Sequence, residues 1–248
     1  MTFGEHPSAS AHADARPYTS SEIQARAVAL GALLLAALFP VGILAFRMAR
    51  FDALTYSFLV WNLFLAGIPV AFAVLAELAW RCQRRFLTIG LLGGWLAFFP
   101  NAPYITTDLV HLRERAPVPV WLDALILTSA ALAGLLAGFV SLHIVQQMAE
   151  DRLGMRWGWA LCATVLTVAS FGVYVGRFAR FNSWDLLTAP HEILYDVTGR
   201  VADPLSGLTA LAVTLSFTAL QLVSYVVIRS LGRLRSLGAA PPGARRAR

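Results

Sequence analysis

The sequence contains no lysine, and charged residues of every kind make up only 14% of its 248 residues. Soluble domains carry about 25% charged residues, so this composition argues against a water-soluble protein. The basic residues are twenty arginines, which give a net charge of +6. Because they lie in short segments between apolar runs and near the C-terminus, they indicate membrane topology and lipid contact rather than nucleic-acid binding.

Cysteine is also scarce. Cys82 lies among arginines at the end of an apolar run, whereas Cys162 lies inside another run. These contexts predict different depths in a membrane, so the sequence favours neither a disulfide nor a metal site built on this pair. A small-residue cleavage site is also missing after the first apolar run. We therefore expect that run to be a retained helix and not a cleaved signal peptide.

Long apolar runs occupy most of the chain, in which 58% of residues are hydrophobic and the mean hydropathy is +0.64. A membrane-spanning helix needs about 20 largely apolar residues. Six runs meet or approach that length: 25–46, 54–78, 86–99, 120–144, 157–176 and 208–228. We predict an all-α, polytopic membrane protein with about six transmembrane helices over residues 25–230 and short interfacial helices in the third and fifth loops. Disordered tails are expected over residues 1–24 and over the Arg-rich residues 231–248.

The arginines give this topology an orientation. With six spans, thirteen arginines lie on the side of the two termini and seven lie on the opposite side. Cytoplasmic segments carry the excess of positive charge, so both termini are predicted to be cytoplasmic. The C-terminal tail carries most of this difference, because the loops alone hold five arginines on the first side and seven on the other.

Small residues recur four positions apart in two of the predicted spans. Gly90 and Gly94 form such a pair in the third span, and Ala130, Gly134 and Gly138 continue the pattern in the fourth. This spacing lets helix backbones approach closely, which would pack the third and fourth spans together. Chance spacing in alanine-rich helices is the alternative explanation.

A polar, proline-broken stretch, FFPNAPYITTDLVHLR, occupies residues 98–113 directly after the third span. That span has 14 residues and is therefore about 21 Å long, against about 30 Å of hydrocarbon. Pro100 and Pro103 oppose a smooth continuation of the helix. We expect a short interfacial helix to follow, with Asn101 as its N-cap.

This short helix would place Tyr104, Asp108 and His111 on one face. Asp108 and His111 are three residues apart and hence neighbours on a helix. Such a pair could orient a general base or supply two metal ligands, although two ligands do not make a metal site. The structural alternative is an ion pair, to His111 or to an arginine, that fixes a loop at the membrane surface.

The second polar stretch, residues 176–203, is predicted to lie on the same side. Arg177 and Arg180 are expected to share a helix face, and Asn182 could cap a turn that contains Trp184 and Asp185. Arginines beside a carboxylate could clamp an anionic headgroup or a phosphate. They could equally reach the membrane surface or pair with a carboxylate of this side, for which the candidates are Asp108, Asp123 and Asp185.

Two further acidic positions carry weaker signals. Asp123 lies in the first turn of the fourth predicted span, where the helix dipole favours an acid, and it is a possible member of the same site. His191 and Glu192 are adjacent, but the second histidine of a zinc-protease helix is missing. No metal site is expected.

The two polar stretches carry a family resemblance. The pattern PNAPY-x-x-TD-x-x-HL stands at residues 100–112, and R-x-x-R-x-NSWD stands at residues 177–185. In these motifs, and over roughly residues 30–230, the sequence resembles a family of bacterial membrane proteins called domain of unknown function 1361. The resemblance implies an integral membrane protein with these polar elements as its hallmark. It implies no substrate, cofactor or catalytic residue.

The predicted function is that of a multi-pass inner-membrane protein with a polar site at the outer interface. This site would bind or process a lipid headgroup or a small anionic molecule, and membrane lipids are the expected partners. Whether the protein is an enzyme stays open, and so does any cofactor. The alternatives are a small permease-like transporter and a non-catalytic membrane subunit or assembly factor. The catalytic candidates are Asp108, His111, Asp123 and Asp185, and the binding candidates are Asn101, Tyr104, Arg177, Arg180, Asn182 and Trp184.

Overall fold

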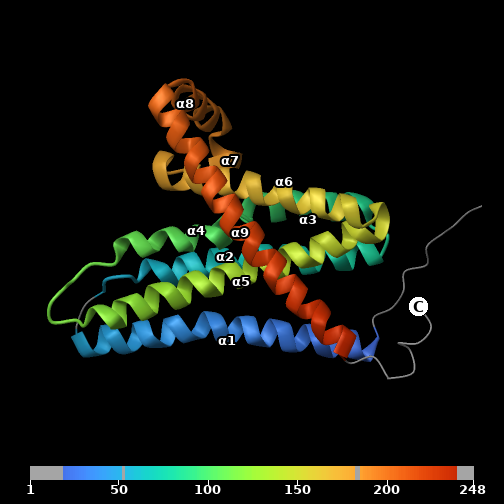
Figure 1. Cartoon of the computed structure of the whole chain (residues 1–248), viewed down its shortest axis with the longest axis horizontal. Coiled ribbons are helices and arrows are strands. Elements are labelled where there is room, and N and C mark those ends of the chain that lie inside the picture. The colour runs from blue at the N-terminus through green and yellow to red at the C-terminus, as the bar shows by residue number, and fades with distance from the viewer. Residues whose placement is uncertain (1–18, 52–53, 182–184, 239–248) are drawn as a thin grey trace, which may run out of the picture.

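The computed structural model describes residues 19–51, 54–181 and 185–238, which form helices joined by short turns (Figure 1). The long helices are α1 (Ser20–Phe51), α2 (Phe58–Arg81), α3 (Arg85–Phe98), α5 (Val120–Leu153), α6 (Met155–Tyr174) and α9 (Pro204–Gly238). The short ones are α4 (Asn101–Tyr104), the 3₁₀-helix η1 (Ile105–His111), the π-helix η2 (Val175–Ala179), α7 (Asp185–Thr188) and α8 (Pro190–Ala202). Six stretches are long and apolar enough to cross a membrane, which confirms the predicted all-α, six-span architecture.

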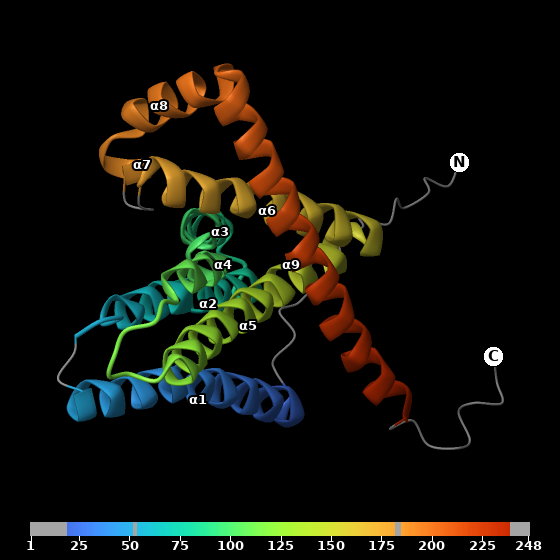
Figure 2. The ribbon, with the colours of Figure 1, turned by 60° about the vertical axis from the view of Figure 1, so that its left-hand side comes forward.

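Helix α5 lies at the centre of the bundle. It contacts α1, α2, α4, η1 and α6, whereas α9 packs on α6 and crosses the others obliquely (Figures 1 and 2). The side chains of Leu122, Ile126 and Leu127 on α5 are buried with Leu59 and Leu63 of α2. A second apolar cluster joins the other half of α5 to α3, α6 and α9. Most of the core is therefore built around one helix.

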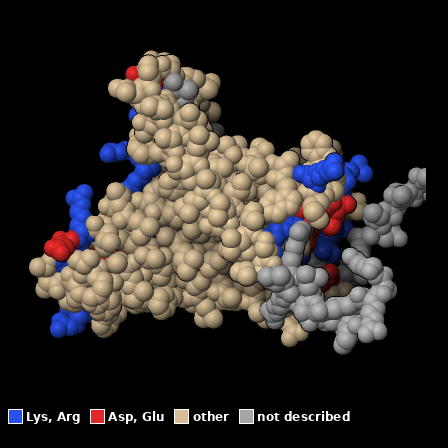
Figure 3. Space-filling view, in the orientation of Figure 1, with Lys and Arg blue, Asp and Glu red and all other residues tan. Residues whose placement is uncertain are grey.

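Successive spans run in opposite directions, so their loops gather at two ends of the bundle. We call the end where α1 begins and α9 ends the terminus side, and the opposite end, with the loops after α1, η1 and α6, the motif side (Figure 1). In the space-filling view, charged side chains gather near both ends and on the projecting α7–α8 region, and an uncharged band separates them (Figure 3). An uncharged band between two charged ends is the pattern that a bilayer imposes on spanning helices.

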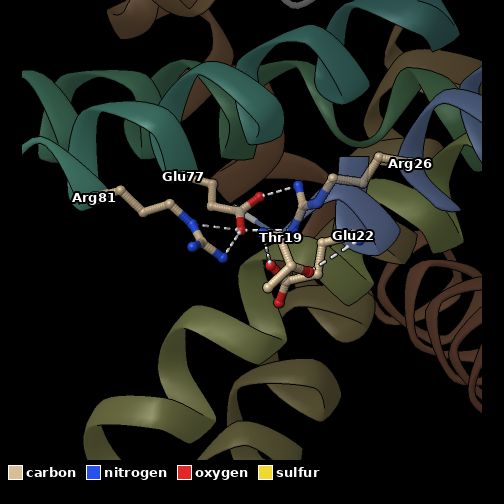
Figure 4. Close-up of polar contacts among 5 residues, drawn as sticks. All are labelled: Thr19, Glu22, Arg26, Glu77 and Arg81. Carbon is tan, nitrogen blue, oxygen red and sulfur yellow. Dashed lines mark hydrogen bonds and ion pairs between the residues drawn. The ribbon is translucent and has the colours of Figure 1, made fainter. Parts of the chain in front are cut away.

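Both terminal helices are longer than the predicted spans. Helix α1 begins at Ser20, because Thr19 and Glu22 form a reciprocal capping box (Figure 4). The Thr19 N–H donates to Glu22 Oε2 at 2.8 Å, and the Glu22 N–H donates to Thr19 Oγ1 at 3.3 Å. Helix α9 continues to Gly238, into the segment that was expected to be disordered.

An ion-pair cluster ties α1 to α2 on the terminus side. Arg26 of α1 forms a bidentate pair with Glu77 of α2, in which Nη2 donates to Oε1 at 2.7 Å (Figure 4). Arg81 donates to the same Oε1 from Nη2 at 3.1 Å, as residues four apart on one helix face can. The Glu77 carboxylate is buried and shared between two guanidinium groups, which compensates its desolvation.

The break after α3 lies deeper than predicted. Gly134 is 14 residues after the first residue of α5, about 21 Å along the helix axis, and a Cβ on it would lie 2.7 Å from the carbonyl oxygen of Ala102. Helix α4 therefore packs inside the bundle, and the expectation of an interfacial helix directly after Pro100 is wrong. The chain stays helical from Arg85 to His111, apart from the short turn at residues 99–100.

Glycines make room for this packing. Gly138 of α5 also faces Ala102, and Gly172 of α6 lies against the ring of Pro100. The small residues of α5 thus meet α4, whereas Gly94 of α3 faces Phe72 of α2. The small residues of the fourth span thus pack on α4, which follows the predicted third span, and the prediction that Gly90 and Gly94 pack the third span on the fourth is wrong.

Candidate functional site

The candidate site is centred on Asp108, near the motif-side end of the bundle. Asp108 and His111 lie on η1, and a 3₁₀-helix aligns residues three apart one above the other. The Asp108 side chain is only 3% exposed, and the amide of Asn62 on α2 donates to its Oδ2 at 2.8 Å. The buried carboxylate is thus held by an amide from a neighbouring helix.

Arg177 brings the second polar stretch onto the first. Its Nη1 lies 3.6 Å from Asp108 Oδ1, and its Nη2 lies 3.3 Å from His111 Nε2. Since a guanidinium group can only donate, His111 Nε2 is the acceptor of this hydrogen bond. The distance between His111 Nε2 and Asp108 Oδ1 is 4.0 Å, so the three side chains form a compact triangle.

The triangle of Asp108, His111 and Arg177 is closed on one side and open on the other. The side chains of His111 and Arg177 are 42% and 23% exposed, although Asp108 beneath them is buried. Asn62 is four residues after the start of α2, about 6 Å along its axis, so the triangle lies about one helical turn inside the motif-side end. Its arginine and histidine can therefore meet a group that approaches from the motif side.

Asp123 belongs to a different and closed ion pair. Its Oδ1 accepts from Nε of Arg47 on α1 at 2.6 Å, and both side chains are only 1% exposed. The Asp123 carboxylate thus neutralises a buried arginine between α5 and α1. The helix dipole at the start of α5 favours the carboxylate further.

Tyr56 connects this pair to η1. Arg47 and Arg115 each place the guanidinium carbon 5.2 Å from the centre of the Tyr56 ring. The Tyr56 hydroxyl donates to the carbonyl oxygen of His111 at 3.0 Å and accepts from Arg115. Burial raises the pKa of Tyr56, and the nearby Asp123 carboxylate raises it further. The neutral hydroxyl thus fixes the last residue of η1 in place.

The structure assigns Asn101 and Tyr104 to packing around the break. Asn101 is the first residue of α4 rather than its N-cap, and its amide donates to the carbonyl oxygen of Phe98 at 2.9 Å. Pro100 and Pro103 lack N–H groups, so carbonyls at the end of α3 need other donors. The ring of Tyr104 lies against Gly176 at the start of η2. Asn101 therefore supports the break itself, and Tyr104 joins the two polar stretches from within the bundle.

Of the other candidates in the second stretch, the structure describes Arg180 and Asp185. Arg180 has a left-handed conformation, with φ of 63°, and is exposed, so it does not share a helix face with Arg177 as predicted. Asp185 is the half-buried first residue of α7 and has a polar interaction of its own. Asn182 and Trp184 lie outside the described residues. Among the residues that the structure describes, no group of three or more His, Cys, Asp or Glu side chains could hold a metal ion.

Four residues of this region were not predicted to belong to it: Asn62, Arg47, Tyr56 and Arg115. The amide of Asn62 stands inside an apolar span. Polar groups in spans are costly unless they are paired, so this position in the sequence indicates a polar partner. Nothing in the sequence pairs Arg47 with Asp123, since 75 residues separate them.

Comparison with known proteins gives a family but no activity. No curated protein matches the chain, and no solved structure matches it. Residues 61–224 match the family described as "Protein of unknown function (DUF1361)". This range includes Asn62, Asp108, His111 and Arg177, and it covers more than half of the sequence. The chain therefore belongs to the DUF1361 family.

Proposed function

We propose that Arg177, with Asp108 and His111, binds the phosphate or carboxylate of a lipid headgroup or of a small anionic molecule. The site would lie at the outer interface of a bacterial inner membrane. The observation that carries the proposal is the position of Arg177, which is half-buried against the carboxylate of Asp108 and the imidazole of His111 and still partly exposed.

Arg177 has donors to spare. A guanidinium group offers five N–H donors. Within the described part of the chain, Arg177 makes one hydrogen bond, to His111, and its distance of 3.6 Å to Asp108 exceeds a hydrogen bond. Oxygens of a phosphate or carboxylate would complete the set, since a guanidinium fork binds such groups in a bidentate manner.

The neighbouring groups orient this arginine. Asn62 occupies Oδ2 of Asp108 and leaves Oδ1 facing Arg177. The buried carboxylate thus holds the guanidinium group in position, and this preorganisation lowers the entropic cost of ligand binding. By contrast, Arg47 and Asp123 are sealed from solvent, so this pair supports the fold and has no donor open to a ligand.

The test is ligand retention by the purified protein in nanodiscs of phosphatidylcholine. Added phosphatidylglycerol is counted on the released complex by native mass spectrometry, and glycerol 3-phosphate is titrated as the soluble anion. Because a charge-assisted hydrogen bond contributes about 1.5–3 kcal/mol, Arg177→Gln should weaken binding about tenfold or more. Arg113→Gln is the matched control, since Arg113 is an exposed arginine on the same side.

The two anions separate the two ligand sources. Competition by glycerol 3-phosphate at equal affinity would identify a small-anion site, whereas retention of phosphatidylglycerol alone would identify a lipid site. Equal binding of both anions by the wild type and Arg177→Gln would refute the proposal.

A further inference from the structure

A cavity lies on the terminus side, at the opposite end of the bundle from Arg177. It has a volume of about 250 Å³ and lies between the α2–α3 turn and the end of α5. Its lining residues are Trp80, Gln83, Arg85, Thr88, Ile89 and Arg152. Two arginines, an aromatic ring and an apolar wall thus converge on one space, and none of the described residues that line it is acidic.

The positive charge of this cavity is not compensated. Arg85 begins α3 and Arg152 lies in the last turn of α5, and neither side chain has a hydrogen bond or ion pair with any residue that the structure describes. Glu77 and Glu150, two acids of this side, already pair with other arginines. Glu77 is shared by Arg26 and Arg81 (Figure 4), and Glu150 accepts from Arg229 at 2.6 Å.

The start of α3 adds to the attraction for an anion. Its N-cap position, Arg84, provides no side-chain hydrogen bond to the first turn. The N–H groups of a first turn lack partners within the helix, and the helix dipole makes this end positive. A phosphate group placed between Arg85 and Arg152 would lie close to these N–H groups.

The apolar wall indicates a lipid rather than a soluble anion. Ile89 lines the cavity and is 67% exposed, and Phe86, one turn before it on α3, is 92% exposed. These side chains continue from the cavity onto the outer surface of the bundle, where acyl chains would lie. Trp80 is suited to the headgroup region, because tryptophan is enriched at membrane interfaces.

We propose that this cavity binds the phosphodiester headgroup of an anionic phospholipid, with one acyl chain along Phe86 and Ile89. Basic pockets between spanning helices on the cytoplasmic side are suited to such headgroups. The proposal concerns the end of the bundle opposite to the triangle of Asp108, His111 and Arg177, and it does not depend on that site.

The experiment uses the full chain in phosphatidylcholine nanodiscs with phosphatidylglycerol added, and counts retained lipids by native mass spectrometry. The double variant Arg85→Gln/Arg152→Gln should lower phosphatidylglycerol affinity tenfold or more. Arg156→Gln, which changes an exposed arginine outside the cavity lining, should leave it unchanged. Arg177→Gln should also leave this binding event unchanged, which separates the two proposed sites.

A second variant distinguishes lipid from free phosphate. Ile89→Gln should weaken phosphatidylglycerol binding, because it removes part of the apolar wall, and both arginines remain. Wild-type affinity in the double arginine variant would overturn the proposal. It would also be overturned if glycerol 3-phosphate displaced the lipid fully at equal concentration, since the cavity would then recognise a soluble anion.

Discussion

Two ion pairs near the motif side differ in how far they are closed to solvent. Arg47 and Asp123 are both buried and meet at 2.6 Å, whereas Arg177 meets Asp108 at 3.6 Å and stays partly exposed. A closed pair in a low-dielectric interior cannot lose one partner without leaving an uncompensated charge. An open pair can exchange part of its contact for a ligand. Exposure thus separates the structural arginine from the candidate ligand-binding one.

The closed pair leads to a stability prediction. Asp123→Asn leaves the guanidinium group of Arg47 buried without its counter-ion, so the free energy of unfolding should fall by about 3–5 kcal/mol. The double variant Arg47→Met/Asp123→Leu removes both charges and should lose less. Reversible unfolding in mixed detergent micelles measures both values.

Asp151→Asn is the control for this prediction, because Asp151 is an exposed acid of the same helix and its replacement should change stability by less than about 0.5 kcal/mol. If the double variant were less stable than Asp123→Asn, the uncompensated charge of Arg47 would not be the cause of the lost stability.

The break between α3 and α4 shows how an element of this chain is fixed by its neighbours. Pro100 and Pro103 interrupt the helix, and Asn101, Thr106 and Thr107 return hydrogen bonds to the carbonyls of Phe98, Pro103 and Tyr104. Helix-breaking residues are tolerated in spans when side chains satisfy the freed backbone groups in this way. Close contact with the glycines of α5 and α6 then holds α4 inside the bundle.

This contact can be tested at a single position. Gly134→Ala would place a Cβ 2.7 Å from the carbonyl oxygen of Ala102, so backbone must move. Overpacking of this kind costs about 1–3 kcal/mol, and we expect a lower free energy of unfolding even though alanine is the better helix former. Gly90→Ala is the matched control, because a Cβ on Gly90 of α3 meets nothing within 4 Å.

Measured by the same unfolding assay, Gly90→Ala should be neutral or stabilising. Equal stability of Gly134→Ala and Gly90→Ala would show that α4 does not pack on α5 at this depth.

Helix α9 is attached by polar contacts along one face. Gln221 donates to Ser170 of α6 at 2.9 Å, and the hydroxyl of Tyr225 donates to Gln146 of α5 at 2.5 Å. One turn further on, Arg229 pairs with Glu150. Residues 221, 225 and 229 are four apart and share a helix face. In a bilayer, where apolar surfaces gain little from meeting each other, such hydrogen bonds supply part of the attraction between helices.

The whole molecule carries its charge at two ends, and the arginine count predicts which end faces the cytoplasm. Six spans put both termini, the α2–α3 turn and the α5–α6 turn on one side of the bilayer. In the sequence, thirteen of the twenty arginines fall in segments assigned to that side, so the rule for positive charge predicts that it faces the cytoplasm. The triangle of Asp108, His111 and Arg177 would then open to the outside.

Cysteine labelling tests this orientation. In a background of Cys82→Ser and Cys162→Ala, Glu114→Cys should react with a membrane-impermeant maleimide in intact cells. Arg156→Cys should react only after the cells are permeabilised, since it lies on the terminus side. Both positions are exposed in the structure, so access and not burial decides the result. The reverse labelling pattern would place both termini outside and exchange the faces of the two proposed sites.

The sequence by itself determined the class of this protein and part of its local geometry. Six apolar runs of sufficient length require spanning helices, because a bilayer leaves no other partner for so much backbone. The spacing of Asp108 and His111 made them neighbours in either an α-helix or a 3₁₀-helix, so that contact did not depend on the fold. The Glu77–Arg81 pair was equally local.

Only the tertiary structure decided which distant polar groups meet. Asn62, Asp108 and Arg177 come from α2, η1 and η2, and Asp123 was directed to Arg47 instead of the same site. These choices depend on the depth of α4 and on the turn after η2, which gives Arg180 a left-handed backbone and separates it from Arg177. Helix periodicity carries no information on either feature, because both arise from packing between segments far apart in the chain.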